Sequence, residues 1–89
     1  MKIARRAQAG TMQSSDIMVF TEPGEELVIE IDSTVAKQYE HLIRAKITEV
    51  ISRMGITAGI FRIKDRGALD YAIAARVEAV INRAKEQSA

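Results

Sequence analysis

The chain has 89 residues, of which 47% are hydrophobic and only 4% aromatic, so we expect one small domain (1–89) with an aliphatic core. Its 13 basic and 12 acidic side chains leave a net charge of +1, which argues against a nucleic-acid binder or a basic membrane-surface protein. It contains no cysteine, which excludes disulfides, thiolate catalysis and cysteine-based metal sites.

Residues 1–6 contain no apolar run of the kind found in a signal peptide. No stretch approaches the roughly 18 apolar residues of a membrane span. We therefore expect a soluble cytoplasmic protein, with residues 87–89 as a frayed tail.

The N-terminal third predicts a β-hairpin followed by a third strand. Residues 7–12 are weakly strand-like, and residues 17–21 are rich in β-branched and aromatic side chains. The polar residues 13–16 (QSSD) form a turn between them, with Ser14 near its tip. After a second turn at Pro23-Gly24, residues 27–32 alternate as a strand. Its three shared-face side chains are Leu27, Ile29 and Ile31.

Two amphipathic helices and one strand follow. Asp32 or Ser33 can cap a helix of about six turns that ends at Gly55. Its predicted buried stripe comprises Val35, Tyr39, Leu42, Ile43, Ile47, Val50, Ile51 and Met54. Residues 59–64 predict a strand and residues 65–67 a turn. The second helix begins near Ala68, with Asp70 in its first turn. Its predicted buried stripe comprises Leu69, Ala72, Ile73, Val77, Val80, Ile81 and Ala84.

The predicted fold class is therefore α+β, in the order βββαβα, with two helices packed on one face of a small sheet of about four strands. The third and fourth strands should be parallel, because a helix of this length connects them as a right-handed crossover. The order of the strands in the sheet stays open.

The sequence contains no set of residues that would form a catalytic centre. His41 is the single histidine, and no nucleophile lies at a recognisable spacing from it. Asp65 and Asp70 fit a turn and a helix start better than an acid–base pair. One histidine with scattered carboxylates does not make a metal site. A carrier or binding module is thus favoured over an enzyme.

Three stretches resemble, in the same order, the citrate lyase acyl carrier protein family, the gamma subunit of that complex. They are residues 9–19 (AGTMQSSDIMV), 33–39 (STVAKQY), and 65–70 (DRGALD) running into 75–79 (ARVEA). In this family the serine that matches Ser14 carries a covalent prosthetic group. The group derives from 2'-(5''-triphosphoribosyl)-3'-dephospho-CoA, is joined through a phosphodiester and ends in a thiol.

The resemblance implies a non-catalytic subunit that carries acetyl and citryl thioesters during the cleavage of citrate to acetate and oxaloacetate. The implied partners are the transferase (alpha) and lyase (beta) subunits and a prosthetic-group transferase. Covalent attachment would make both reactions effectively intramolecular.

The pattern departs from the family beside the attachment point. Gln13 stands where an acid is expected, and Ser15 adds a second hydroxyl, although the register favours Ser14. Arg5 and Arg6 would lie roughly 25 Å away along a strand, so we expect the arm to swing freely, with cationic contacts supplied by partners.

Alternative functions stay open. They are the carrier subunit of citramalate lyase or malonate decarboxylase, or an α+β interaction module without a covalent group.

Overall fold

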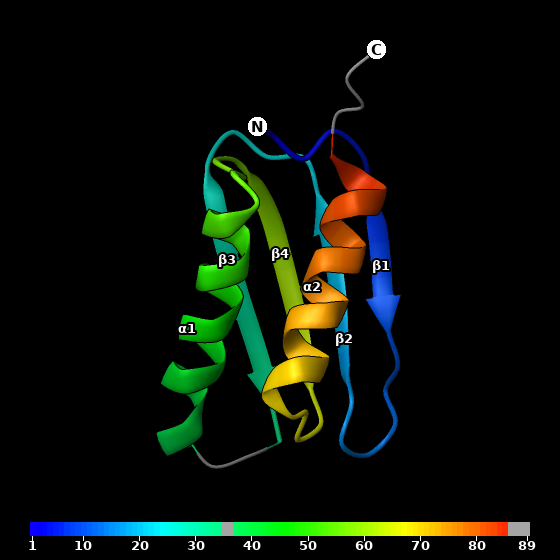
Figure 1. The fold of residues 1–89 in the computed structure, drawn as a ribbon, viewed down its shortest axis with the longest axis vertical. Helices are drawn as coiled ribbons and strands as arrows, with labels where there is room; N and C mark the ends of the chain where they lie inside the picture. Colours follow the sequence, from blue (N-terminus) through cyan, green and yellow to red (C-terminus); the bar gives the residue numbers. More distant parts are fainter. Residues whose placement is uncertain (35–36, 86–89) are drawn as a thin grey trace.

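The computed structural model describes residues 1–34 and 37–85 and confirms the α+β class and the predicted order of elements (Figure 1). The elements are β1 (Ala7–Gly10), β2 (Ile17–Glu22), β3 (Leu27–Ser33), α1 (Lys37–Arg53), β4 (Gly59–Asp65) and α2 (Asp70–Ala84). No helix in this described part of the chain is long and apolar enough to cross a membrane.

The four strands form one sheet in the order β1-β2-β4-β3. β1 pairs antiparallel with β2, and β2 pairs antiparallel with β4. β3 pairs parallel with β4, which confirms the predicted crossover through α1. β4 comes last of the strands in the sequence but lies between the β1–β2 hairpin and β3. Its C-terminal end pairs with the start of β2.

Both helices cover the same face of the sheet (Figure 1). Side chains alternate across each strand, so every second residue of β2 and β4 reaches the core. The buried residues from the sheet include Ile17, Val19, Phe61 and Ile63, and those from the helices include Ile43, Ile47, Val50, Ile51, Ile73, Val77, Val80 and Ile81. The core is aliphatic apart from Phe61, as the composition predicted.

The predicted stripe of α1 is correct only in its second half. Tyr39 and Leu42 were expected to be buried, but they are 50% and 56% exposed. They line a hollow of about 180 Å³ between the start of α1 and the start of α2, where no facing layer covers them. Val35 lies outside the described residues. Asp32 and Ser33, the predicted caps of this helix, are instead the last two residues of β3. Met54 is half-buried.

Two further apolar side chains are more exposed than predicted. α2 begins at Asp70, two residues after the predicted start near Ala68. Leu69 therefore precedes the helix, with extended backbone and 58% exposure. Leu27, expected on the same face as Ile29 and Ile31, begins an edge strand and is 38% exposed. Ala72 is half-buried, and the rest of the predicted α2 stripe is buried. The predicted frayed tail lies outside the described residues.

An arginine from a helix covers each edge of the sheet. On the outer edge of β1, the Arg83 guanidinium donates to the carbonyl oxygen of Gln8 at 2.6 Å. On the outer edge of β3, the Arg44 guanidinium donates to the carbonyl oxygen of Ile29 at 3.1 Å. Edge strands expose unpaired backbone groups that can recruit another chain, and these two arginines occupy one such group on each side.

The difference between the two halves of α1 predicts contrasting effects of truncation. Ile47→Ala should lower the free energy of unfolding by about 3 kcal/mol, because it leaves a cavity at a fully buried position. Leu42→Ala, on the same helix, should lower it by less than about 1 kcal/mol. Urea unfolding followed by circular dichroism measures both values, and equal losses would contradict the assigned burial.

Candidate functional site: an exposed serine on a fixed turn

Ser14 lies in the turn that joins β1 to β2, at the end of the molecule where α1 and α2 both begin (Figure 1). Its side chain is exposed to solvent, as expected for the tip of a hairpin. Within residues 1–34 and 37–85, no side-chain contact occupies its hydroxyl. The hydroxyl is therefore accessible to a macromolecule approaching this end.

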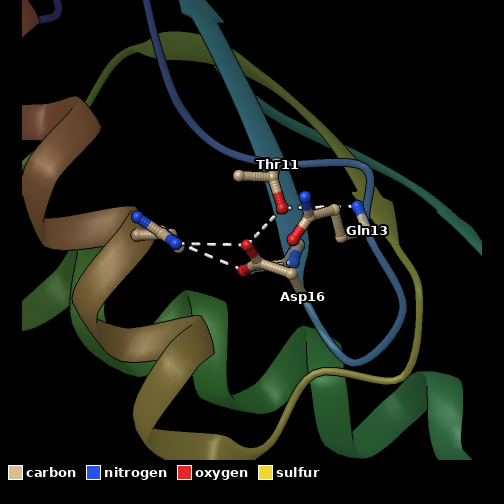
Figure 2. A network of polar contacts seen from close by, with 5 residues as sticks. Thr11, Gln13 and Asp16 are labelled. Atoms are coloured by element: carbon tan, nitrogen blue, oxygen red, sulfur yellow. Dashed lines mark hydrogen bonds and ion pairs between the residues drawn. The ribbon is translucent and has the colours of Figure 1, made fainter.

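The turn is held on one side by the carboxylate of Asp16 (Figure 2). The Thr11 hydroxyl donates to this carboxylate at 2.5 Å, and the Arg76 guanidinium of α2 donates to both of its oxygens, at 3.1 and 3.3 Å. The backbone N–H of Gln13 in turn donates to the Thr11 hydroxyl at 3.3 Å. One carboxylate thus connects both arms of the turn to a helix distant in the sequence.

On its other side, backbone hydrogen bonds join the turn to the segment after β4. The Ser15 N–H donates to the Arg66 carbonyl oxygen at 2.8 Å, and the Arg66 N–H donates to the Asp16 carbonyl oxygen at 2.9 Å. These bonds continue the β2–β4 ladder past its last pair, Ile17 with Asp65. Ser14 therefore directly precedes two residues, Ser15 and Asp16, whose backbone groups are hydrogen-bonded to Arg66.

The chain reverses direction through two unusual backbone conformations. Gly10 has φ +97°, and a Cβ there would overlap the carbonyl oxygen of Ile17, so only glycine fits. Ser15 has φ +65°, a left-handed conformation that a residue with a Cβ adopts at some cost. The turn has a specific shape that the tertiary contacts maintain.

Asp65 organises the same end of the molecule from inside. Its side chain is only 1% exposed and accepts hydrogen bonds from the Ser33 hydroxyl at 2.9 Å and from the N–H groups of Gly67 and Ala68 at 3.2 and 3.0 Å. It thereby fixes the end of β3 and the loop into α2. The predicted turn role is right for residues 66 and 67, but Asp65 itself is the last residue of β4.

Hydrogen bonding shifts the titration of Asp16. The hydrogen bond from Thr11, followed by that from the Ile17 N–H, lowers its pKa from the ordinary value of 3.8 to about 2. Burial opposes the shift, and Arg76 adds a smaller lowering. The carboxylate is ionised at neutral pH, so its contacts with Thr11 and Arg76 are charge-assisted.

The other residues considered for chemistry remain apart. His41 is exposed on α1, and Asp70 is exposed in the first turn of α2. Among the described residues, no group of three or more histidines and acidic residues is placed to hold a metal ion. Among the residues that the structure describes, no base is hydrogen-bonded to the Ser14 hydroxyl, the contact by which a serine nucleophile is activated.

Sequence reasoning missed the basic residues near this turn. It considered Arg5 and Arg6, which belong to the opposite end of the molecule (Figure 1). Arg66 and Arg76 instead reach the turn through hydrogen bonds across 51 and 60 residues of sequence. No local pattern around Ser14 signals either contact.

A small α+β domain that presents the Ser14 side chain to solvent, on a turn held by hydrogen bonds to Arg66 and Arg76, has the geometry of a carrier protein. The family model described as "Malonate decarboxylase delta subunit" matches residues 4–84. The chain is also 46% identical over 88 residues to the citrate lyase acyl carrier protein of Haemophilus influenzae, covering 99% of this chain and 93% of that protein.

A second relative, the citrate lyase acyl carrier protein of Halothermothrix orenii, is 44% identical over 87 residues, covering 97% of this chain and 93% of the relative. The chain therefore belongs to the family of acyl carrier proteins that includes those of citrate lyase. The resemblance found in the sequence is confirmed.

Solved structures share the fold. A chain of a Pseudomonas malonate decarboxylase hetero-tetramer, in complex with malonate, superimposes with a TM-score of 0.71 at 24% identity, covering 89% of this chain and 82% of that chain. A protein from Thermus thermophilus superimposes with a TM-score of 0.68 at 15% identity, covering 93% of this chain but 16% of the other. At such identities these structures support the fold alone.

The lowered pKa of Asp16 predicts a specific loss of stability in acid. Since its pKa is lower in the folded chain, the carboxylate stabilises the fold above about pH 4 and loses that contribution as the pH falls toward 2. Asp16→Asn should lower the free energy of unfolding at pH 7 by about 1–2 kcal/mol. The difference from the wild type should shrink toward pH 2.

Urea unfolding from pH 7 to about pH 2 measures this difference. Glu25→Gln, an exposed acid in the turn between β2 and β3, is the matched control and should follow the wild-type curve at every pH. A constant gap between Asp16→Asn and wild type would contradict the role assigned to the Asp16 carboxylate.

Proposed function

We propose that this chain is the acyl carrier subunit of a citrate lyase complex, with its prosthetic group joined through a phosphodiester to the Ser14 hydroxyl. The observation that carries the proposal is the exposed Ser14 side chain on a turn that Asp16, Arg76 and Arg66 hold in place. Membership of the acyl carrier family supports it independently. In this role the carrier works in the cytoplasm, beside its partner enzymes.

The residues present fit the derivative of 2'-(5''-triphosphoribosyl)-3'-dephospho-CoA that the family implies. Attachment needs a hydroxyl that an enzyme can reach, and Ser14 offers one. When bound, the group supplies a thiol that holds acyl units as thioesters. The chain contributes a rigid root around Ser14. The Gln13 N–H donates to the Thr11 hydroxyl and the Ser15 N–H donates to the carbonyl oxygen of Arg66, just after β4. The Asp16 carboxylate accepts from Arg76 of α2.

Ser14 is favoured over Ser15 as the attachment residue. Ser15 has a left-handed backbone, and its N–H is bonded to Arg66. An enzyme that bound an extended segment around Ser15 would have to break this contact, whereas Ser14 lies one residue nearer the tip. The register of the family resemblance gives the same assignment.

A malonate decarboxylase carrier is the second candidate, since the matching family model is described by that enzyme and the fold is shared with a chain of its hetero-tetramer. The similarity is unequal, however. Relatives named for citrate lyase are 46% and 44% identical over nearly the full chain, while the malonate decarboxylase chain is 24% identical. We therefore place the protein with citrate lyase.

The end of the molecule that bears Ser14 also carries most of the exposed apolar side chains. Tyr39 and Leu42 lie in the first turns of α1, and Leu69 and Tyr71 lie at the start of α2, with exposures of 50% to 74%. Exposed apolar groups that gather on one surface mark sites of protein contact. We assign this surface to the transferase and lyase subunits, which must both reach the arm.

Substitution of the two turn serines tests the attachment site. When the chain is produced together with its prosthetic-group transferase, wild type and Ser15→Ala should gain the mass of one group. Ser14→Ala should gain none. Intact mass spectrometry reads the result directly, and modification that survives Ser14→Ala, or an unmodified wild type, would contradict the proposal.

The apolar end predicts a selective loss of partner binding. The double variant Leu42→Asp/Leu69→Asp should weaken binding to purified transferase and lyase subunits by about tenfold or more, because it places charge in an apolar contact. Both positions are exposed, so the fold should be retained. Leu27→Asp, at the opposite end of the molecule, is the control, and isothermal titration calorimetry gives the dissociation constants. Equal affinities for the double variant and the control would exclude this surface.

A further inference from the structure

One lysine and one arginine, Lys64 and Arg66, lie beside the attachment turn and form no ion pair with any described residue. We infer that Lys64 and Arg66 bind the phosphate groups at the root of the covalent arm, an inference that rests on the proposed attachment at Ser14. The chain thus holds the first part of its own arm and leaves the thiol end free. The contacts come from this subunit, not only from its partners.

The positions of these residues follow from the sheet. Lys64 pairs with Met18 of β2 on one side and with Asp32 of β3 on the other. Arg66 follows the end of β4, and its backbone is bonded to Ser15 and Asp16. Side chains alternate along a strand, so Lys64 and Arg66 share the face of the sheet opposite the helices.

A hollow of about 190 Å³ lies between the attachment turn and the ends of β3 and β4. Its lining residues are Met12, Asp32, Thr34, Lys64, Asp65 and Arg66. Met12 lies two residues from Ser14, a separation of at most about 7 Å between their Cα atoms. Pockets for drug-sized ligands occupy about 300–1,000 Å³, so this smaller hollow suits a phosphate group better than a whole nucleotide.

The charges of the hollow favour an anion. Within residues 1–34 and 37–85, neither Lys64 nor Arg66 takes part in an ion pair. Nearby Arg62, by contrast, pairs with Glu22 at 3.3 Å and with Glu30 at 3.9 Å.

One exposed carboxylate, that of Asp32, opposes the two cations. The carboxylate of Asp65 is buried on the helix-covered face and accepts three hydrogen bonds there. The exposed side chains of the hollow therefore carry one positive charge in excess.

The ion pairs of Lys64 and Arg66 with the phosphate groups of the arm are weak enough to be reversible. Lys64 and Arg66 are both exposed to solvent, and exposed ion pairs in water contribute little free energy and are screened by salt. A partner active site can therefore take up the arm by competing for its phosphates. Between reactions, Lys64 and Arg66 keep the root of the arm against the sheet.

Phosphorus and nitrogen NMR of the modified chain tests this inference without measuring enzyme activity. Loading is first established by intact mass. In wild type, attachment should shift the backbone amide of Thr34 and give phosphorus resonances that move toward those of the free group as salt rises to 1 M, where the screening length is about 3 Å. The double variant Lys64→Gln/Arg66→Gln should lose both effects, and Asp32→Asn should strengthen them.

Lys2→Gln/Arg5→Gln is the matched control, because it removes two exposed cations at the opposite end of the molecule (Figure 1). It should behave as wild type. Phosphorus resonances that are the same in wild type and in Lys64→Gln/Arg66→Gln, in chains shown to be loaded, would overturn the inference while leaving the carrier function intact. A wild-type chain that gains no mass would contradict the carrier function, and the inference with it.

Discussion

The carboxylate of Asp65 is the constraint on which the Ser14-bearing end of this protein depends. A carboxylate that is 1% exposed is costly unless it is well hydrogen-bonded. Here the Ser33 hydroxyl and two backbone N–H groups meet that requirement. The next residue, Arg66, is bonded to the turn around Ser14. The buried carboxylate thus helps to fix where β3, β4 and the turn around Ser14 lie relative to one another.

Rigid support and an absence of reactive groups are complementary properties in a carrier. The turn is held by Asp16 through Thr11 and Arg76 (Figure 2). It is also held by backbone pairing with Arg66. No general base adjoins Ser14 in the described residues. Ser14 thus lies on a held turn with its side chain open to solvent, which is what the proposed attachment requires.

The local features of the fold were predictable from the sequence, because they depend on residues close together in the chain. A composition rich in β-branched and aromatic residues predicted β2, and alternation predicted β3 and β4. Three-and-four spacing predicted the buried halves of both helices. The same spacing predicted that Tyr39 and Leu42 are buried, and this prediction was wrong. Periodicity identifies the face of a helix but not the point at which the opposing layer ends.

The surroundings of Ser14 were not predictable in this way. The turn itself and the exposure of Ser14 follow from four polar residues in a row. Arg66 and Arg76, however, reach the turn only because β4 is inserted beside β2 and α2 packs over the hairpin. The sequence analysis estimated the distance from Ser14 to Arg5 and Arg6 by counting residues along one strand. It could not identify Arg66 and Arg76 as nearer cations, because the order of the strands was unknown.

The arginines on the two sheet edges restrict how this carrier can be recognised. A strand added beside β1 or β3 would first have to displace Arg83 from Gln8 or Arg44 from Ile29. Backbone-directed capture is thereby disfavoured, and recognition falls to side chains at the surface. Surface side chains can be exchanged without disturbing the main chain, so the same main-chain fold can present different recognition surfaces. A malonate decarboxylase chain that is 24% identical shares this fold.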